Sequence, residues 1–309
     1  MAFYSSSAAM GQTLADLVRA LELQGRSGLA QRLSITWVRY PASLLACGAA
    51  DGLATPPAAA QGASWGGNRQ LYPASVVKLV YLIAAEAWLQ DDLLVDDPEL
   101  RRALAAMIQD SSNDATGLVV DLLSGTTSGP ALPAAAMASW IEQRQLVNQW
   151  LAALGWPELE GVNACQKTWG DGPFGREREF YGSSLENRNR LSSDVTARLL
   201  QAVMASALVS PPACGRMQAL LARSLDPGQR AADPENQVDG FLGEGLPPGA
   251  RLWSKAGWMS QARHDAAYVE VDGHAPFVLV AFSEGEACAA DTTLLPEIGR
   301  RLSAACRIA

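Results

Sequence analysis

Strand-like patterns occur only near the two ends of this 309-residue chain, and helical patterns fill the middle. Because strands are stable only when they pair, strands from one end are expected to pair with those from the other. The expected fold is therefore α/β (α+β): one antiparallel sheet formed from both ends and flanked by N- and C-terminal helices, with an inserted all-helical subdomain. The runs that indicate strands are 33–40, 43–49, 251–257, 264–272 and 275–283.

Helical periodicity and helix start signals set the expected domain limits. Residues 1–70 and 226–309 would form the sheet-plus-helix subdomain, and residues 71–225 the inserted helical subdomain. Loops are expected at 51–70, 124–133, 155–190 and 225–250, and the segment 155–190 is long enough to indicate a functional loop. Helices are expected at 12–31, 75–90, 98–109, 113–123, 137–154, 193–207, 213–224 and 292–306.

One lysine lies inside an apolar run. The segment 72–83 reads YPASVVKLVYLI, in which Ser75 stands where a helix begins and Lys78 follows three residues later on the same face. Free backbone N–H groups at a helix start favour negative charge on Ser75, and a neutral, buried Lys78 amine could accept its proton. The alternative is a helix-capping serine followed by a lysine whose amine reaches water.

Lysine is rare in this chain, which has 21 arginines and only three lysines: Lys78, Lys167 and Lys255. A buried amine can lose its proton, whereas a guanidinium cannot. Each lysine is therefore a candidate for a chemical role. Lys167 belongs to no motif, however, and is expected to lie at the surface.

Charge and composition exclude several classes of function. The net charge is −8, so nucleic acid and anionic lipid are not expected partners, and a small-molecule substrate is. His264 and His274 are too few and too isolated for a metal site, and no cofactor is expected. Five separated cysteines outside any CxxC pair are typical of a reducing compartment.

No run of about 18 apolar residues is present, so no membrane span is expected. The first residues also lack a basic leader followed by a long apolar stretch. A cytoplasmic location is therefore expected for the sequence as given, and a periplasmic one if a leader has been removed.

Two further short motifs follow the serine–lysine pair along the chain. Ser111 and Asn113 lie between two expected helices, where the serine could relay a proton and the asparagine could bind an amide; a helix-capping turn is the alternative. Lys255 and Gly257 lie on an expected strand, where they could admit a substrate along the strand edge. Each motif is weak evidence by itself.

Together, the three motifs resemble those of the penicillin-recognising serine hydrolases. S-x-x-K, S-x-N and K-x-G, in this order at a helix start, an interhelical turn and a strand, are the signature of that family. The sequence is similar to the class A β-lactamases in particular, over nearly its whole length. The resemblance implies a β-lactamase/transpeptidase-like fold with its active site at the junction of the two subdomains, and a hydrolase that works through an acyl-enzyme.

The resemblance also implies roles for the matching residues of the first two motifs. Ser75 would be the acylated nucleophile, and Lys78 would accept its proton. Ser111 would shuttle the proton, and Asn113 would bind the amide of the substrate.

The third motif would complete the site. By the same resemblance, Lys255 would sustain the electrostatic field around Ser111 and attract a substrate carboxylate. The oxyanion hole would be formed by the backbone N–H groups of Ser75 and of Trp258, the residue after Gly257.

The loop that clears the acyl-enzyme departs from the family pattern. Class A β-lactamases carry R-x-E-x-x-L-N there, and residues 171–194 lack this motif. Glu177 falls at the expected place when positions are counted back from 191–194 without gaps, and Glu179 or Glu186 is an alternative. For each of the three, the favoured interpretation is a solvated partner of nearby arginines, so these side chains are expected to face water.

The middle of the third motif is altered as well, because Ala256 has no hydroxyl to bind a substrate carboxylate. Arg263, on or next to the following strand, could compensate. Acylation is therefore expected to be intact, whereas deacylation and substrate anchoring are expected to be changed.

Residues 62–66 match the G-x-S-x-G motif of α/β-hydrolases, with His264 or His274 following in a possible triad order. That motif needs a strand before it and a helix after it, and neither is expected here. The expected fold is also compatible with an esterase, a D-Ala-type peptidase or a non-catalytic ligand binder. The joint presence of Ser75 and Lys78 favours an enzyme.

Overall fold

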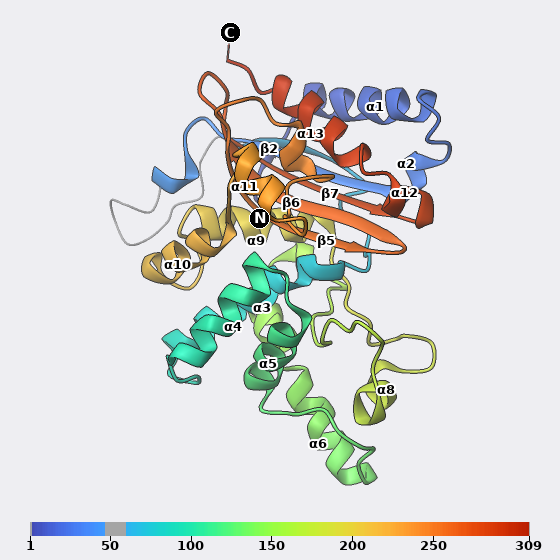
Figure 1. The fold of residues 1–309 in the computed structure, drawn as a ribbon, viewed down its shortest axis with the longest axis vertical. Helices are drawn as coiled ribbons and strands as arrows, with labels where there is room; N and C mark the ends of the chain where they lie inside the picture. Colours follow the sequence, from blue (N-terminus) through green and yellow to red (C-terminus); the bar gives the residue numbers. More distant parts are fainter. Residues whose placement is uncertain (1, 47–59, 309) are drawn as a thin grey trace.

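The computed structural model describes residues 2–46 and 60–308, and its centre is a seven-stranded sheet (Figure 1). The strands are β1 (Ser5–Ser6), β2 (Leu33–Arg39), β3 (Gln61–Trp65), β4 (Ala222–Arg223), β5 (Arg251–Met259), β6 (Ala262–Glu270) and β7 (Phe277–Glu284). Their order is β1-β3-β2-β7-β6-β5-β4, so strands from the two ends of the chain lie side by side. Neighbouring strands are antiparallel except β1 and β3, which are parallel. The expected sheet is confirmed.

Helices cover both faces of the sheet. α1 (Ala8–Leu23) and α13 (Leu294–Ala304) lie on one face, and α9 (Ser193–Met204) packs against β2, β6 and β7 on the other (Figure 1). The central strand β7 therefore buries both of its faces, which explains its continuous apolar run. Leu279 belongs to the core under α1 and α13, and its neighbour Val280 belongs to the core shared with α9.

The helical part of the molecule is centred on α3 (Val77–Gln90). This helix contacts helices on several sides and is buried at every residue from Val77 to Trp88, including Lys78. A helix that is apolar all round belongs in a core. The other helices are α2 (Leu29–Arg32), α4 (Pro98–Gln109), α5 (Asn113–Ser124), α6 (Ala134–Arg144), α7 (Leu146–Ala153), α8 (Gly175–Tyr181), α10 (Pro211–Leu221), α11 (Pro227–Ala232) and α12 (Glu286–Ala290). The 3-10 turns are η1 (Leu44–Ala46), η2 (Ala74–Val76), η3 (Pro157–Leu159) and η4 (Leu242–Gly245).

The prediction of a strand at 43–49 is wrong. Its first part is the turn η1, and residues 47–49 lie outside the described residues. β2 pairs instead with β3, which lies in the segment 51–70 that we expected to be a loop. The residues of β3 are mostly small, so the sequence lacks the β-branched signal of a strand. Gly62 is needed there because a Cβ atom would lie 2.8 Å from Cδ2 of Tyr4.

Two expected helices differ from the prediction. The helix expected at 12–31 begins earlier, because the Ser7 side chain accepts a hydrogen bond from the Met10 N–H, and it ends before Gly25, whose φ is 96°. The helix expected at 137–154 is divided into α6 and α7. The remaining expected helices agree with the structure within a few residues.

The sheet part and the helical part share one core. α9 and β4 both belong to the segment 71–225 that we expected to form the helical subdomain, yet α9 covers the sheet and β4 extends its edge. Side chains of α3, α9 and one sheet face form one apolar cluster. Two segments that we expected to be loops contain short helices. The segment 155–190 contains η3 and α8, and the segment 225–250 contains α11 and η4.

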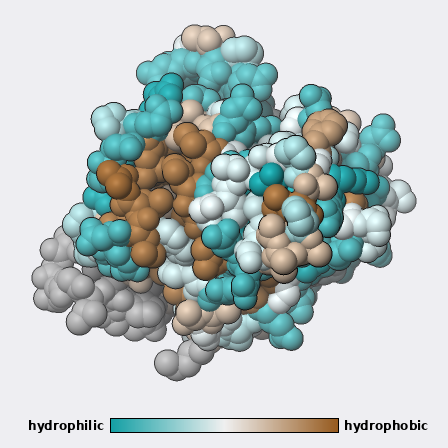
Figure 2. Space-filling model, turned by 90° about the horizontal axis from the view of Figure 1, so that it is seen from below, coloured by the Kyte–Doolittle hydropathy of each residue, from teal (hydrophilic) through white to brown (hydrophobic). Residues whose placement is uncertain are grey.

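Seen from below, the helical part exposes an apolar area (Figure 2). The exposed large apolar side chains of this part include Leu118 and Leu122 of α5 and Leu146 of α7.

Within residues 2–46 and 60–308, no helix has both the length and the apolar character needed to cross a membrane.

Candidate active site

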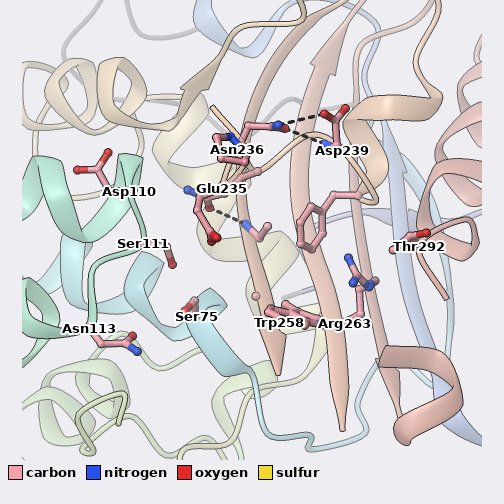
Figure 3. A pocket seen from close by; sticks show the side chains of 15 residues that line it. Ser75, Asp110, Ser111, Asn113, Glu235, Asn236, Asp239, Trp258, Arg263 and Thr292 are labelled. Atoms are coloured by element: carbon pink, nitrogen blue, oxygen red, sulfur yellow. Dashed lines mark hydrogen bonds between the residues drawn. The ribbon is translucent and has the colours of Figure 1, made fainter. Parts of the chain in front are cut away.

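A cavity of about 560 Å³ lies where the sheet part meets the helical part (Figure 3). Its walls come from η2, the turn between α4 and α5, the segment 234–241, and strands β5 and β6. Lys78 and Lys255 do not line it but are buried, with their amines in contact with the lining residue Ser111. The residues singled out from the sequence that line the cavity are Ser75, Ser111, Asn113, Ala256, Gly257, Trp258 and Arg263.

Ser75 lies in η2, and His264 of the sheet forms a hydrogen bond with the backbone just before this turn. His264 on β6 accepts a hydrogen bond at Nδ1 from the Ser283 N–H (3.0 Å), so its proton is on Nε2, which donates to the backbone oxygen of Tyr72 (2.9 Å). Burial lowers the pKa of this imidazole to about 4, and the ring is therefore neutral at pH 7. Ala74, just before the serine, has a φ of 45°, a strained conformation for a residue with a side chain.

Strand β5 passes very close to η2 at Gly257. A Cβ atom there would lie 2.8 Å from the backbone oxygen of Pro73 and 2.9 Å from the backbone nitrogens of Ser75 and Val76. Only glycine permits this approach. In the described structure β4 pairs only with Leu252 and Trp253 near the beginning of β5, and further along the strand the Ala256 N–H donates to the side chain of Gln237.

The Lys78 amine is buried and contacts the turn between α4 and α5. Its Nζ donates to the backbone oxygen of Ser111 (2.5 Å), to Ser111 Oγ (3.2 Å) and to Asn113 Oδ1 (2.9 Å). Ser75 Oγ makes no hydrogen bond within the described ranges. Burial lowers the pKa of Lys78 to about 7, so a large share of this amine is neutral near neutral pH.

Ser111 lies between two amines. Its Oγ is 3.2 Å from Lys78 Nζ and 3.1 Å from Lys255 Nζ, and its φ of 54° is unusual for a non-glycine residue. Lys255 is fully buried. Burial, followed by the positive charges of Arg223 and Lys78, lowers the pKa of the Lys255 amine well below its ordinary value. Both amines around Ser111 are thus shifted toward the neutral form that can exchange protons with a hydroxyl.

Arg263 places a guanidinium at another wall of the cavity, next to Trp258 (Figure 3). Its Cζ lies 5.7 Å from the centre of the Trp258 ring and 5.1 Å from that of Phe241. Nε donates to the backbone oxygen of Ala289 (2.9 Å) and Nη1 to that of Gly240 (3.3 Å), whereas Nη2 has no hydrogen-bond partner in the described part of the chain. The two N–H groups of Nη2 therefore stay available for a ligand.

Glu177 does not line the cavity, and the expectation that it faces water is wrong. Its carboxylate is buried and accepts hydrogen bonds from Arg144 Nη2 and from Ser128 Oγ (2.8 Å), with Lys167 Nζ at 3.8 Å. Arg144 and Lys167 also contact Asp121, at 3.0 Å and 2.6 Å. Lys167, expected at the surface, is therefore buried in this cluster, because two carboxylates compensate its charge.

We predict that Glu177 stabilises the fold through this cluster. Glu177→Gln should lower the free energy of unfolding by about 3 to 5 kcal/mol, because it leaves the fully buried Arg144 with only one carboxylate partner in the described structure. Chemical denaturation measures the change. Glu179→Gln, at an exposed position two residues away, is the matched control and should change stability by less than about 0.5 kcal/mol. Equal stability of the two variants would contradict this role.

The α/β-hydrolase interpretation finds no support. Ser64 lies inside β3, where it pairs with Thr36 of β2, and not at a turn from strand to helix. Both ring nitrogens of His264 are engaged with backbone groups, and His274 is partly buried and does not line the cavity.

Several polar residues that line the cavity carried no motif. Asp110 directly precedes the second motif, and that position could have drawn attention to it. Glu235, Gln237 and Asp239 come from the segment 225–250, which reads as a loop without a signature. These three residues line the cavity because of how the segment 225–250 folds over β5.

The chain belongs to the β-lactamase enzyme family, whose model matches residues 88–306. That match begins after Ser75 and Lys78. The case for these two residues as site residues therefore depends on the S-x-x-K motif and on their place beside the cavity. Comparison with curated protein sequences finds no match.

Solved structures with the same fold are similar along nearly the whole chain. A β-lactamase from Sphaerobacter thermophilus has 18% identity and a TM-score of 0.63, with 95% of this chain and 97% of that chain covered. The protein PBP-A has 15% identity and a TM-score of 0.62, with 98% and 97% covered. A β-lactamase from Xanthomonas campestris has 16% identity and a TM-score of 0.60, with 94% and 97% covered. The expected β-lactamase/transpeptidase-like fold is confirmed.

Proposed function

We propose that this protein is a serine hydrolase that forms an acyl-enzyme on Ser75 with a β-lactam or a related amide or ester. The proposal rests on one observation: Ser111 Oγ contacts two buried amines, Lys78 and Lys255, in the wall of a cavity that Ser75 also lines. Such amines can move protons around a nucleophile. A protein that only bound a ligand would have no need for two buried amines, each of which costs stability.

Acylation begins when the neutral Lys78 amine takes the proton of Ser75, after a side-chain rotation that brings the two groups together. Ser75 Oγ bonds to the carbonyl carbon, Asn113 binds the substrate amide, and the backbone N–H groups of Ser75 and Trp258 stabilise the oxyanion. The carbonyl carbon then loses its bond to the leaving nitrogen or oxygen. Ser111 protonates the leaving group and regains a proton from the Lys78 ammonium.

The charges around the cavity orient the substrate. Arg263 offers a guanidinium with a free donor, whereas Asp110, Glu235 and Asp239 line other parts of the cavity (Figure 3). A substrate carboxylate is attracted to Arg263 and repelled by the three carboxylates. Arg263 in this way replaces the hydroxyl that Ala256 lacks, and Lys255 adds to the attraction when it is charged.

Deacylation is the step that we propose to be slow. Of the three loop glutamates considered for activating water, Glu177 is engaged by Arg144, and neither Glu179 nor Glu186 lines the cavity. A water molecule at the ester then lacks a carboxylate base from this loop. The acyl-enzyme is expected to accumulate.

Intact-protein mass spectrometry after incubation with penicillin G tests this function. We expect an adduct of one penicillin per chain, its absence in Ser75→Ala, and little turnover of a chromogenic cephalosporin. Rapid colour would contradict slow deacylation. Cleavage of a nitrophenyl ester that is lost in Ser75→Ala, without a penicillin adduct, would indicate an esterase. If neither reaction occurs, that result contradicts the proposal and favours a ligand binder.

The rate of adduct formation is expected to rise as the pH passes through about 7 and then to level off. The amine must be neutral to accept the proton of Ser75, and burial brings the pKa of Lys78 to this value. Adduct formation under limiting penicillin G, followed by mass across this range, measures the profile. A rate that does not change with pH would exclude Lys78 as the acceptor.

A further inference from the structure

Gln237 is a buried glutamine whose two amide atoms contact different parts of the candidate site. Its Oε1 accepts hydrogen bonds from Lys255 Nζ and from the Ala256 N–H (3.2 Å). Its Nε2 donates to the backbone oxygens of Ile108 (2.9 Å) and Gln109 (2.8 Å). The orientation of the amide is fixed, because only its nitrogen can donate to two carbonyls.

The two carbonyls belong to the end of α4, just before the turn that carries Ser111. Carbonyls at a helix C-terminus lack partners within the helix and need outside donors. Arg223 provides a second one, since its Nη2 lies 2.8 Å from the backbone oxygen of Ile108 and 3.1 Å from a backbone oxygen of β5. Gln237 and Arg223 together fasten the end of α4 to the sheet.

The Lys255 amine takes its direction from the same glutamine. Its three acceptors in the described structure are Gln237 Oε1, Ser111 Oγ (3.1 Å) and the backbone oxygen of Ala256 (2.8 Å). The backbone oxygen belongs to the neighbouring residue and the hydroxyl can rotate. Gln237 is thus the side chain with a fixed acceptor that keeps the amine directed at Ser111.

We propose that Gln237 is a positioning residue for proton transfer through Ser111. Its Oε1 directs the Lys255 amine at Ser111 Oγ, and its Nε2 holds the turn on which Ser111 lies. This inference rests on the proposed function, because it assigns a role within that reaction. A glutamine suits the role since it neither gains nor loses a proton, whereas a carboxylate would keep the amine charged.

Two variants separate the acceptor from the charge. Gln237→Met keeps the length of the side chain and removes both polar atoms, and Gln237→Glu keeps an acceptor oxygen and adds a negative charge. Isotope-labelled lysine gives side-chain resonances from only three residues, so the titration of Lys255 can be followed in the full-length protein. The pKa of Lys255 should fall in Gln237→Met, which removes an acceptor from the ammonium, and rise in Gln237→Glu.

The other charges that act on Lys255 are the same in all variants. They are Lys78 on α3 and Arg223 on β4, which disfavour a charged amine, and Asp265 on β6, which favours it. The Lys167 resonance serves as an internal standard, because this side chain is held by Asp121 in the cluster around Glu177 and makes no contact with Gln237.

The rate of adduct formation with penicillin G gives the second measurement. We expect Gln237→Met to lower the limiting rate by about 3- to 10-fold, the effect of one lost hydrogen bond to an uncharged amine, with little change in the concentration that gives half the limiting rate. Gln229→Met is the matched control, an exposed glutamine of α11 outside the cavity, and should leave the rate unchanged.

Circular dichroism checks that each variant folds. If Gln237→Met does not fold, the titration of the nearly isosteric Gln237→Glu tests the inference by itself. A titration of Lys255 that coincides with that of the parent protein would overturn the inference, whatever the rates. Because the titration needs no substrate, it also separates the two proposals. Shifted titrations in a protein that reacts with neither penicillin G nor a nitrophenyl ester would support the contact and overturn the proposed function.

Discussion

The burial of one amine in an apolar helix is the constraint on which the rest of the site depends. Lys78 belongs to a helix that is buried on all sides, and its acceptors in the described structure come from Ser111 and Asn113, in the turn between α4 and α5. A buried donor without partners would cost about 1 to 3 kcal/mol or more. That turn must therefore be held in place, and Gln237 from the segment before β5 and Arg223 of β4 do so by binding the end of α4.

The three lysines of the chain differ in the groups that surround their amines. Lys167 contacts Asp121 and lies near Glu177, so its charge is compensated by carboxylates. Lys78 and Lys255 have only uncharged acceptors in the described ranges, and burial lowers the pKa of both amines. The first arrangement fixes a loop to the helical part. The second leaves two amines able to exchange protons, as the proposed acylation requires.

Much of the fold followed from the sequence, because long apolar patterns mark the strands that both faces of the sheet bury. β3 was missed, since its small residues carry no strand signal and its place is set by contact with Tyr4 and β2. The contacts of Lys78 and Lys255 with Ser111 fit what the resemblance implied for the three motifs taken together, whereas each motif alone is equally compatible with an ordinary turn, cap or strand.

Contacts between distant residues were beyond prediction. The burial of Glu177 depends on Arg144, far away along the chain on α6, and no local pattern links the two. The role that we infer for Gln237 depends on how the segment before β5 folds over the end of α4. Side chains whose partners lie far along the chain act through tertiary structure, which periodicity does not encode.

The proposed acylation requires the Lys78 amine to be largely neutral near neutral pH in the folded protein. Titration of its side-chain resonance in lysine-labelled protein, assigned by its absence in Lys78→Met, tests this most directly. We predict a pKa of about 7. A value near 10.5, the ordinary value for lysine, would show a permanently charged amine and contradict its role as the proton acceptor.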